Sequence, residues 1–426
     1  MLFPITKQIK KDGNLNIGNL SASWLKEKYG TPLYVMDIAT IKKQCRDYLE
    51  GFSFGDIASE IIYASKAFSC KAICQLIERE GLSIDVSTGG ELFMALEAGF
   101  PPERIYFHGN NKSEEEIRYG LENNVGCFIV DNFDELKILG KLATDSGKKQ
   151  DIMLRITPGI KASTHKYIQT GMIKSKFGFG IHKSIALDAV KEAENIASLN
   201  LIGLHSHIGS QIFNLSSYGR LVEVMSKFIK EAGSKLGVRI SRLNIGGGLG
   251  IQYTKEDKPP TISDFSKFIS EAVGKSQKKY GIDIEKIYVE PGRSIVGNAG
   301  ITLYEVGVIK EIPGIVNYAA VDGGMSDNIR AILYQAKYEA FIADRMDAKG
   351  EQRNYTIVGK HCESGDVLID DITLPILAKG DLIAVTATGA YCFAMASNYN
   401  GQTKSAVVAV EDEKAGYGYK GKITKI

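Results

Sequence analysis

Short apolar runs alternate with longer amphipathic segments along the chain from about residue 60 to residue 290. The apolar runs are rich in β-branched residues and end in polar or glycine-rich tips, which is typical of strands in a parallel sheet. Eight such runs occur, at residues 60–67, 82–90, 104–111, 127–132, 152–158, 201–210, 242–250 and 286–293. Between them, apolar residues recur at helical spacing in segments 70–80, 90–99, 113–124, 133–147, 185–199 and 217–233.

Strands that alternate with helices form parallel sheets, and eight such units close into a (β/α)8 TIM-type barrel. The alternative is an open, doubly wound sheet that binds a dinucleotide. Against it, Ile251 stands where the dinucleotide fingerprint needs its third glycine, after the stretch GGGLG. We therefore reject NAD binding and expect an α/β barrel over residues 30–290.

The pattern changes after residue 290. Short strands separated by turns are expected at residues 302–311, 315–324, 355–360, 381–388 and 405–411, with a longer helical stretch only near residues 326–345. This pattern indicates a second, mostly β domain. Because the N-terminal segment is too short to form a domain, we expect it to add a strand or two, so that residues 1–29 and 291–426 form the β domain.

Composition and charge narrow the function classes. The chain has 426 residues, 44% hydrophobic and 24% charged, with a formal net charge of +2. This balance gives no electrostatic reason to expect a nucleic acid or a membrane surface as partner. The chain has no apolar run of membrane-spanning length, and its N-terminus lacks the pattern of a signal peptide. We expect a cytoplasmic protein that binds a small molecule.

The cysteines indicate thiols rather than disulfides. Six cysteines in so long a chain do not make a disulfide framework, and a reducing compartment would keep them free. Cys70 and Cys74 lie one helical turn apart, but no further Cys or His pair at zinc-like spacing accompanies them. We expect core residues and no metal.

Active sites of such barrels lie at the C-terminal ends of the strands. These ends carry Lys66, Asp85, His108, Asp131, Arg155, His207, the glycines 246–248 and Glu290. We expect all of them to face one mouth. Ion pairs of the mouth, or helix caps, are an equal explanation for Asp85, Asp131 and Arg155. Whether Asp85, His108, Asn110 and Arg155 touch a ligand stays open.

Lys66 ends the first strand in the sequence YASKA. A lysine at the point where a strand leaves the core is partly desolvated, which lowers its pKa and frees its amine for Schiff-base chemistry. An ordinary solvated lysine is the alternative.

A phosphate site is indicated by the glycines at 246–248 after the seventh strand and by Arg293 after the eighth. A simple tight turn is the alternative for the glycines, and Arg293 favours an anion. Together with a reactive lysine, a phosphate site suggests pyridoxal 5′-phosphate. Glu290 would keep the ring nitrogen protonated, which favours decarboxylation, whereas an arginine there would favour racemisation.

Two histidines alternate in the sequence HSHIGSQ, so their imidazoles are expected on opposite faces of the strand. We assign His207, nearer the tip, to stacking on the cofactor, and His205 to the buried core. Ser210 could donate to the phosphate.

Seven motifs occur in order: YASKA, SKFGFG, HSHIGSQ, NIGGGLG, VEPGR, HCESGD and GAYCFAMASNYN. With them, nearly the whole chain resembles the alanine-racemase-like pyridoxal phosphate decarboxylases. Within that family the resemblance is greatest to the carboxy-lyases that convert meso-2,6-diaminopimelate to L-lysine and CO2, the last step of lysine biosynthesis. Decarboxylation of ornithine, arginine or carboxynorspermidine is the alternative within the same fold.

The resemblance implies roles for individual residues. Lys66 would carry the cofactor and His207 would stack on its ring. The other implied cofactor contacts are Ser210, Gly247, Gly248, Glu290, Pro291, Gly292, Arg293 and Tyr391. The implied substrate contacts are Arg293, Arg330, Tyr334, Glu363 and Tyr391. An arginine at position 330 suits a distal carboxylate, which argues against substrates that end in a bare cation.

The resemblance also implies a homodimer with shared active sites. Cys362 and Glu363, in HCESGD, would be supplied by the second subunit, and Cys362 would return a proton after CO2 leaves. A small buried interface residue is the alternative for Cys362. Glu290 disfavours a racemase, and the β domain and HCESGD disfavour a non-catalytic cofactor carrier.

Overall fold

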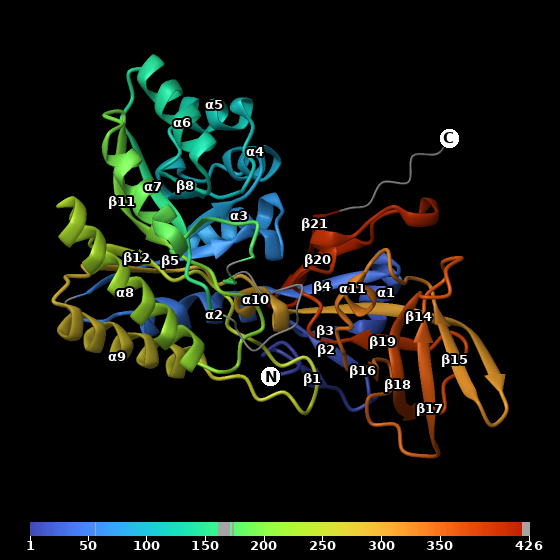
Figure 1. Ribbon diagram of the computed structural model, residues 1–426. Coiled ribbons are helices and arrows are strands. Elements are labelled where there is room, and N and C mark those ends of the chain that lie inside the picture. Colours follow the sequence, from blue (N-terminus) through green and yellow to red (C-terminus); the bar gives the residue numbers. More distant parts are fainter. Residues whose placement is uncertain (56, 161–170, 173, 420–426) are drawn as a thin grey trace. The chain divides into compact units, whose positions relative to one another are not determined.

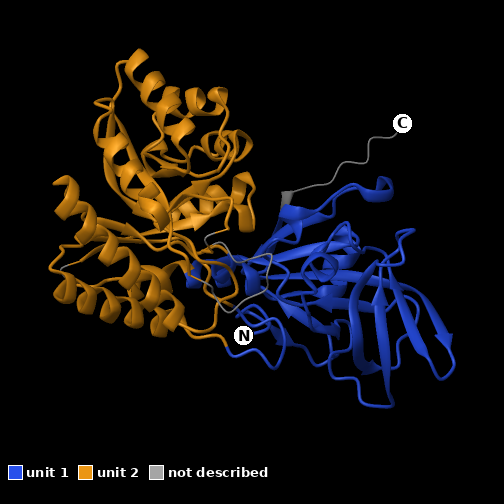
Figure 2. Cartoon of the chain, viewed as in Figure 1, with its two compact units in different colours: residues 1–44, 251–258, 293–426 blue, residues 45–250, 259–292 orange. Residues whose placement is uncertain are grey.

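The computed structural model describes residues 1–55, 57–160, 171–172 and 174–419 (Figure 1). The chain forms two compact units (Figure 2). Unit 1 comprises residues 1–44, 251–258 and 293–426, and unit 2 comprises residues 45–250 and 259–292.

Unit 2 is a closed barrel of parallel strands. They are β5 (Ala58–Ala64), β6 (Ser83–Val86), β7 (Ile105–Phe107), β8 (Cys127–Val130), β9 (Gln150–Thr157), β11 (Leu199–His205), β12 (Arg242–Asn244) and β13 (Lys286–Val289). Each pairs in parallel with the next, and β13 pairs with β5 to close the ring. The short β10 (Phe179–Gly180) pairs with the end of β9. The predicted (β/α)8 barrel is confirmed.

The barrel helices lie between these strands, and all but α9 coincide with a helical segment expected from the sequence. They are α3 (Lys71–Arg79), α4 (Gly89–Glu97), α5 (Glu114–Glu122), α6 (Phe133–Asp145), α7 (Ile185–Glu194), α8 (Ser216–Leu236) and α9 (Ile262–Tyr280), while α2 (Ile38–Gly51) crosses the boundary between the units. Side-chain caps set several of their starts: Ser113 and Glu116 form a capping box on α5, and Asn132 accepts from the N–H of Glu135 at α6.

The interior of the barrel is filled by side chains. Ile62, Tyr106, Ile129, Met153 and Tyr288 come from different strands and form one buried cluster. The barrel is therefore a packed core, and its chemistry is confined to the strand ends.

Unit 1 is mostly β-structure. One sheet runs in the order β18 (Val367–Pro375), β17 (Gln352–Val358), β15 (Val316–Val321), β14 (Gly300–Ile312), β4 (Leu33–Asp37), β20 (Ala406–Glu411) and β21 (Lys414–Tyr419). β19 (Leu382–Val385) pairs with β14 and with β16 (Ala340–Ile342). The N-terminal strands β1 (Gln8–Ile9), β2 (Leu15–Ile17) and β3 (Leu20–Ser21) form a small sheet, followed by α1 (Ala22–Tyr29).

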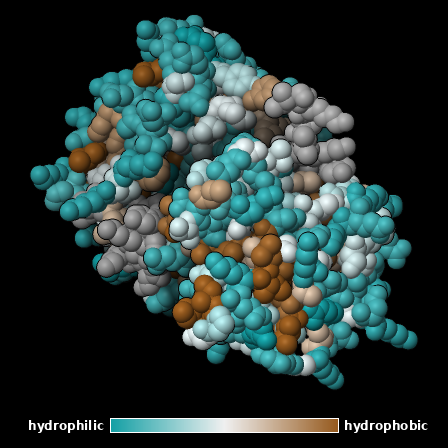
Figure 3. Space-filling model, turned by 90° about the vertical axis from the view of Figure 1, so that its right-hand side faces the viewer, coloured by the Kyte–Doolittle hydropathy of each residue, from teal (hydrophilic) through white to brown (hydrophobic). Residues whose placement is uncertain are grey.

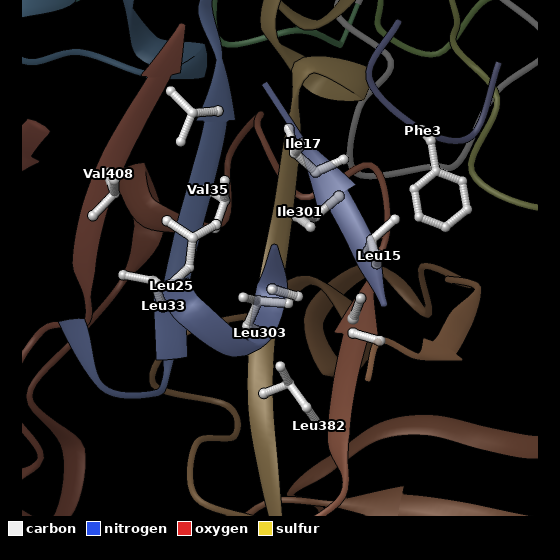
Figure 4. Packing of buried hydrophobic residues seen from close by; sticks show 14 residues of the cluster. Phe3, Leu15, Ile17, Leu25, Leu33, Val35, Ile301, Leu303, Leu382 and Val408 are labelled. Atoms are coloured by element: carbon white, nitrogen blue, oxygen red, sulfur yellow. The ribbon is translucent and has the colours of Figure 1, made fainter. Parts of the chain in front are cut away.

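The N-terminal segment and the C-terminal part of the chain share one core in unit 1 (Figure 4). Leu15 and Ile17 of β2 pack in the same cluster as Ile301 and Leu303 of β14 and Val408 of β20. All five side chains are buried, and burying an aliphatic side chain of this size contributes about 1.5–3 kcal/mol. The second, mostly β domain built from both ends of the chain is confirmed.

The unit boundaries differ from the domain boundaries expected from the sequence. Residues 30–44 and 251–258 lie in unit 1, although the expected barrel began at residue 30 and ran unbroken to residue 290. The reason at the N-terminal side is strand pairing, because β4 pairs with β14 and β20 of the β unit.

The helical stretch expected near residues 326–345 is wrong. The helix α11 spans only Arg330–Tyr334, and Gln335 ends it in a left-handed conformation with φ of 52°. Beyond it, Tyr338, Ala340 and Ile342 are buried at every second position, which is the period of a strand. The last two belong to β16.

The face of the molecule shown in Figure 3 is largely hydrophilic, with one patch where apolar side chains gather. Among the described residues, every helix is too short or too polar to span a bilayer.

Candidate active site

The strand ends of unit 2 bring together the polar residues that the sequence singled out. Lys66 lies in the 3₁₀ turn η1 (Ser65–Ala67) directly after β5, and Glu290 directly follows β13. The other strand-end residues are Asp85 on β6, His108 after β7, Asp131 after β8, Arg155 on β9 and His205 at the end of β11. The charges of Glu290, Arg155 and Lys66 all act on the pKa of His108.

Glu290 is the centre of this cluster. Asn244 donates from Nδ2 to Glu290 Oε1 at 2.8 Å, and His205 Nε2 lies 3.1 Å from Oε2, where it can donate in the Nε2-protonated form. His108 Nε2 lies 3.0 Å from Oε1, within ion-pair distance but off the hydrogen-bond direction. All four side chains are buried. Several donors around a buried carboxylate stabilise its charged form.

The shifted pKa values in this cluster also indicate that the Glu290 carboxylate is ionised. Burial favours the neutral acid, but the two imidazoles beside it, His205 through its hydrogen bond, outweigh burial and hold the pKa of Glu290 well below its usual value. Burial lowers the pKa of His205 to about 4 and also lowers the pKa of His108, although Glu290 opposes both shifts. At neutral pH both imidazoles are therefore neutral and Glu290 is ionised.

Both histidines of HSHIGSQ belong to the site. Because β11 ends at His205, strand alternation does not extend to His207. His205 is buried as expected, but its partner is Glu290. His207 Nδ1 accepts the N–H of Gly247 at 3.3 Å. Burial lowers the pKa of His207 well below its usual value, and the charge of Lys66 adds to this shift.

Lys66 is exposed, whereas Ser65 and Ala67 on either side are buried. The expectation of a partly desolvated amine is therefore wrong, because the turn carries this side chain beyond the strand end and out of the core. The turn itself is fixed, since the N–H of Ser65 donates to Asp85 Oδ1 at 3.0 Å. Burial and the charge of Glu290 raise the pKa of Asp85 well above its usual value, and the charge of Lys66 opposes this.

The glycines at 246–248 form a tight loop against the end of β13. A Cβ added to Gly247 would overlap the carbonyl oxygen of Glu290 and lie 2.9 Å from its carbonyl carbon. Tyr218 of α8 donates to the carbonyl oxygen of Gly247 at 3.1 Å, and the N–H of Ile212 donates to the next glycine carbonyl at 2.9 Å. The second bond places the loop that contains Ser210 beside the glycine loop.

Pro291 and Gly292 join the last strand of the barrel to the first. The N–H of Ala64, at the end of β5, donates to the carbonyl oxygen of Pro291 at 3.1 Å. A Cβ on Gly292 would lie 2.9 Å from the Cβ of Ala64 and 3.0 Å from that of Ala67. Glycine at 292 therefore permits close approach of the VEPGR segment to the turn that carries Lys66.

Asp131 and Arg155 organise the SKFGFG segment. Arg155 Nε lies 3.8 Å from Asp131 Oδ2, and its guanidinium lies 4.2 Å from the ring centre of Phe177. The other carboxylate oxygen of Asp131 accepts the N–H of Gly178 at 2.9 Å. These contacts support the ion-pair explanation for both residues. The carbonyl oxygen of Asn110 accepts from Asn132 at 3.2 Å.

Unit 1 carries a second cluster, built from arginines and tyrosines. Arg330 donates to the hydroxyl of Tyr338, and its guanidinium lies 4.9 Å from the ring centre of Tyr253. Arg293 donates to the hydroxyl of Tyr253 and lies 4.7 Å from the ring centre of Tyr391. Both arginines are buried, and Arg330 Nε has no hydrogen-bond partner among the described residues. A buried guanidinium among aromatic rings with an unused donor is suited to bind an anion.

Unit 1 also carries the implied substrate contacts Tyr334 and Tyr391. Tyr334 is the last residue of α11, one helical turn after Arg330, and is half-buried. Tyr391 has a φ of 65°, a conformation that costs a residue other than glycine about 1–3 kcal/mol and persists only where the surrounding structure enforces it.

The HCESGD segment is a loop between β17 and β18 in unit 1. His361 and Asp366 are buried, whereas Cys362 and Glu363 are exposed. The other five cysteines are buried. Cys362 is therefore not a packing residue within the described chain.

The comparisons with known proteins agree with this geometry. A family model for the pyridoxal binding domain of pyridoxal-dependent decarboxylases matches residues 38–297. Diaminopimelate decarboxylase from Bacillus subtilis (strain 168) is 48% identical over 410 residues, which cover 96% of this chain and 93% of the relative. The chain belongs to the diaminopimelate decarboxylase family.

Solved structures of diaminopimelate decarboxylases share the fold of this chain. The enzyme from M. jannaschii in co-complex with L-lysine has a TM-score of 0.92 and 34% identity, covering 99% of this chain and 96% of its own. The enzyme from Helicobacter pylori complexed with L-lysine has a TM-score of 0.86 and 34% identity, covering 94% of this chain and 96% of its own. The resemblance inferred from the motifs is thus confirmed.

The site of this diaminopimelate decarboxylase family member fits pyridoxal phosphate, the cofactor of the family. The ionised carboxylate of Glu290 can pair with a protonated pyridine nitrogen. The backbone loop at Gly247, where a side chain would overlap the Glu290 carbonyl group, is suited to bind a phosphate. Ligand atoms of His108, His205 and Glu290 lie within 4.8 Å of one another, as they would around a metal ion.

Sequence reasoning missed several residues of both clusters. Asn244 opens the NIGGGLG motif but has no role in the sequence interpretation, and the link from His205 to Glu290 joins residues 85 positions apart. Tyr253 and Tyr338 carry no sequence signal for an arginine site. The buried period-two pattern around Tyr338 could have indicated its inward orientation.

Proposed function

We propose that this chain decarboxylates meso-2,6-diaminopimelate to L-lysine and CO2 with pyridoxal 5′-phosphate, the last step of lysine biosynthesis. The observation that carries the proposal is the ionised, buried Glu290 among the strand ends that also carry Lys66. Diaminopimelate decarboxylases of the same fold, including two solved with L-lysine, support the substrate class.

We assign the cofactor-binding roles as follows. The Lys66 amine binds the cofactor covalently, Glu290 holds a proton on its ring nitrogen, and His207 packs on its face. The phosphate is bound by Ser210, Gly247, Gly248, Gly292, Arg293 and Tyr391, with Pro291 shaping the loop. Bound there, pyridoxal phosphate supplies an electron sink for the charge that remains on carbon when CO2 leaves. His205 and Asn244 keep Glu290 in its charged form.

The substrate-binding roles fall mainly on unit 1. Arg330 binds the distal carboxylate, because a buried guanidinium with an unused Nε can form a two-point contact with a carboxylate. Arg293, Tyr334 and Tyr391 complete the binding set, and Glu363 meets the distal ammonium. A substrate that ends in a bare cation, such as ornithine or arginine, would meet the wrong charge at Arg330.

Cys362 is the proposed proton donor, and it acts in the site of a second subunit of a homodimer. Its exposure in the single chain supports this role, since a donor that works in another subunit must lie at the surface. Exposed apolar residues Ile332 and Leu333, next to Arg330, and the apolar patch in Figure 3 favour a protein partner.

Six free thiols favour a reducing, cytoplasmic location. We assign most cofactor contacts to residues 30–290. Residues 1–29 and 291–426 provide the substrate and dimer contacts and the remaining cofactor contacts, at residues 291–293 and Tyr391.

A substrate comparison tests the proposal. The purified protein with pyridoxal phosphate is assayed for CO2 release from meso-diaminopimelate, ornithine and arginine at equal concentrations. We expect kcat/KM for meso-diaminopimelate to exceed the other two by at least about 100-fold, because an unpaired buried charge costs several kcal/mol. Equal or faster release from ornithine would overturn the assignment of the distal site and favour a diamine-forming enzyme.

A further inference from the structure

The loop that carries Cys362 is closed by one buried hydrogen bond between His361 and Asp366. His361 Nδ1 lies 2.7 Å from Asp366 Oδ2, and the backbone N–H of His361 donates to the same oxygen at 3.0 Å. The other oxygen of Asp366 accepts the N–H of Met325 at 2.6 Å. Both side chains are almost fully buried, at 1% and 2% exposure. Three charge-assisted bonds to one carboxylate make this a strong local anchor.

Backbone atoms of neighbouring residues lie close around the carboxylate of Asp366. A Cβ on Gly324 would lie 2.5 Å from Asp366 Oδ2, and a Cβ on Gly359 would lie 2.5 Å from the carboxyl carbon. The N–H of Gly359 also donates to the carbonyl oxygen of Asp366 at 2.9 Å, which ties the two ends of the loop together. The position of the carboxylate is thus fixed from several sides.

The tip of the loop is fixed by bonds to its backbone. The N–H of Cys362 donates to Asn400 Oδ1 at 2.9 Å, and the N–H of Glu363 donates to the carbonyl oxygen of His361 at 2.8 Å. The ring of His361 stacks on Tyr399, with ring centres 5.7 Å apart and planes at 22°. Cys362 is thus held through its backbone, while its thiol side chain stays exposed.

We propose that His361 and Asp366 are positioning residues that set where the thiol of Cys362 stands when it delivers its proton. The inference rests on the proposed role of Cys362. His361 is the residue directly before Cys362, so its side-chain bond to Asp366 and its backbone bond to the same oxygen fix the direction in which the chain enters position 362. A donor displaced by about 1 Å can slow a reaction by about 100-fold.

Two substitutions at position 361 separate the hydrogen bond from the ring contact. His361→Phe keeps a ring that can stack on Tyr399 but removes the Nδ1 donor. His361→Asn removes the ring but keeps an amide N–H close to the place of Nδ1. We expect kcat to fall by about 10-fold or more in the phenylalanine variant and by less than about 3-fold in the asparagine variant, with KM nearly unchanged in both.

A solvent isotope effect supplies a readout that a loss of packing would not change. If proton delivery becomes slow, the ratio of kcat in H2O to kcat in D2O should be larger for the phenylalanine variant than for the parent. The ratio for the asparagine variant should equal that of the parent. Asp366→Asn, which removes the charge and one of the two acceptor oxygens of this anchor, provides a second route to the result if the phenylalanine variant does not fold.

The outcomes distinguish the inference from the proposal on which it rests. If Cys362→Ala leaves kcat and the isotope effect unchanged, the proposed role of Cys362 fails. If Cys362→Ala lowers kcat but the phenylalanine and Asp366→Asn variants match the parent, the positioning role fails while the role of Cys362 stands. Equal losses in the phenylalanine and asparagine variants, or a loss confined to KM, would also overturn the positioning role.

Discussion

The glycine loop provides the sharpest test of how the fold makes the site. Gly247 lies against the carbonyl group at the end of β13, so a methyl group at this position would overlap the carbonyl oxygen of Glu290. Both sides of this contact are backbone, which cannot rotate away as a side chain can. In Gly247→Ala, the loops after β12 and β13 must therefore move apart.

The expected cost follows from that displacement. Overpacking a close-packed interior by one carbon costs about 1–3 kcal/mol, and a contact between backbone groups falls at the upper end of this range. The same movement lengthens the hydrogen bond from Asn244 to Glu290, because Asn244 lies directly before the loop and also accepts the N–H of Gly246 at 2.9 Å. We expect the dissociation constant for pyridoxal phosphate to rise by at least about 10-fold, as a loss of about 1.4 kcal/mol would produce.

The assay compares Gly247→Ala with a matched glycine elsewhere in unit 2. Gly274 lies inside α9, and a Cβ there would have no atom within 4 Å. Gly274→Ala should therefore raise the free energy of unfolding by about 0.5–1 kcal/mol and leave cofactor binding unchanged. Denaturant unfolding of the cofactor-free proteins and absorbance titration with pyridoxal phosphate measure both quantities. Parent-like stability and parent-like cofactor binding in Gly247→Ala would refute the assigned role of the loop.

Three further predictions follow from the described contacts. Lys66→Ala should lose both turnover and the visible absorbance of covalently bound cofactor, and retention of both would contradict its role. Arg330→Lys should raise KM for meso-diaminopimelate by about 10-fold or more, since lysine cannot form the two-point contact, and an unchanged KM would place the carboxylate elsewhere. Because burial lowers the pKa of His205 to about 4, the unfolded chain takes up a proton below about pH 6.5 while the folded chain does not. Between pH 6.5 and 5 the cofactor-free parent should thus lose roughly 1.5 kcal/mol more unfolding free energy than His205→Gln, and equal losses in denaturant titrations would contradict the shift.

The barrel was predictable from the sequence because its signal is local and repeated. Each strand is a short apolar run that ends in a polar tip, and the closure of eight such units is a general rule rather than a property of this chain. The placement of Lys66 and Glu290 at strand ends followed from the same pattern. The β unit was predictable as a class, but the short length of α11 was not, because the left-handed Gln335 that ends it has no sequence signature.

The environment of each site residue was less predictable. His205 and Asn244 contact Glu290 because three strands come together at one end of the barrel. The spacing of these residues along the sequence does not predict the contact. Tyr253 was missed for a related reason: the chain leaves the barrel unit at residues 251–258 and returns to it at Pro259. Sequence alternation also failed at His207, because the strand had already ended.

The central claim is that Glu290 holds a proton on the cofactor ring, and nitrogen NMR of the protein loaded with pyridoxal phosphate labelled with ¹⁵N in the ring tests it most directly. The account predicts a protonated ring nitrogen throughout pH 6 to 9 in the parent, and loss of that proton in Glu290→Gln. An unprotonated ring nitrogen in the parent, or the same signal in both proteins, would contradict it.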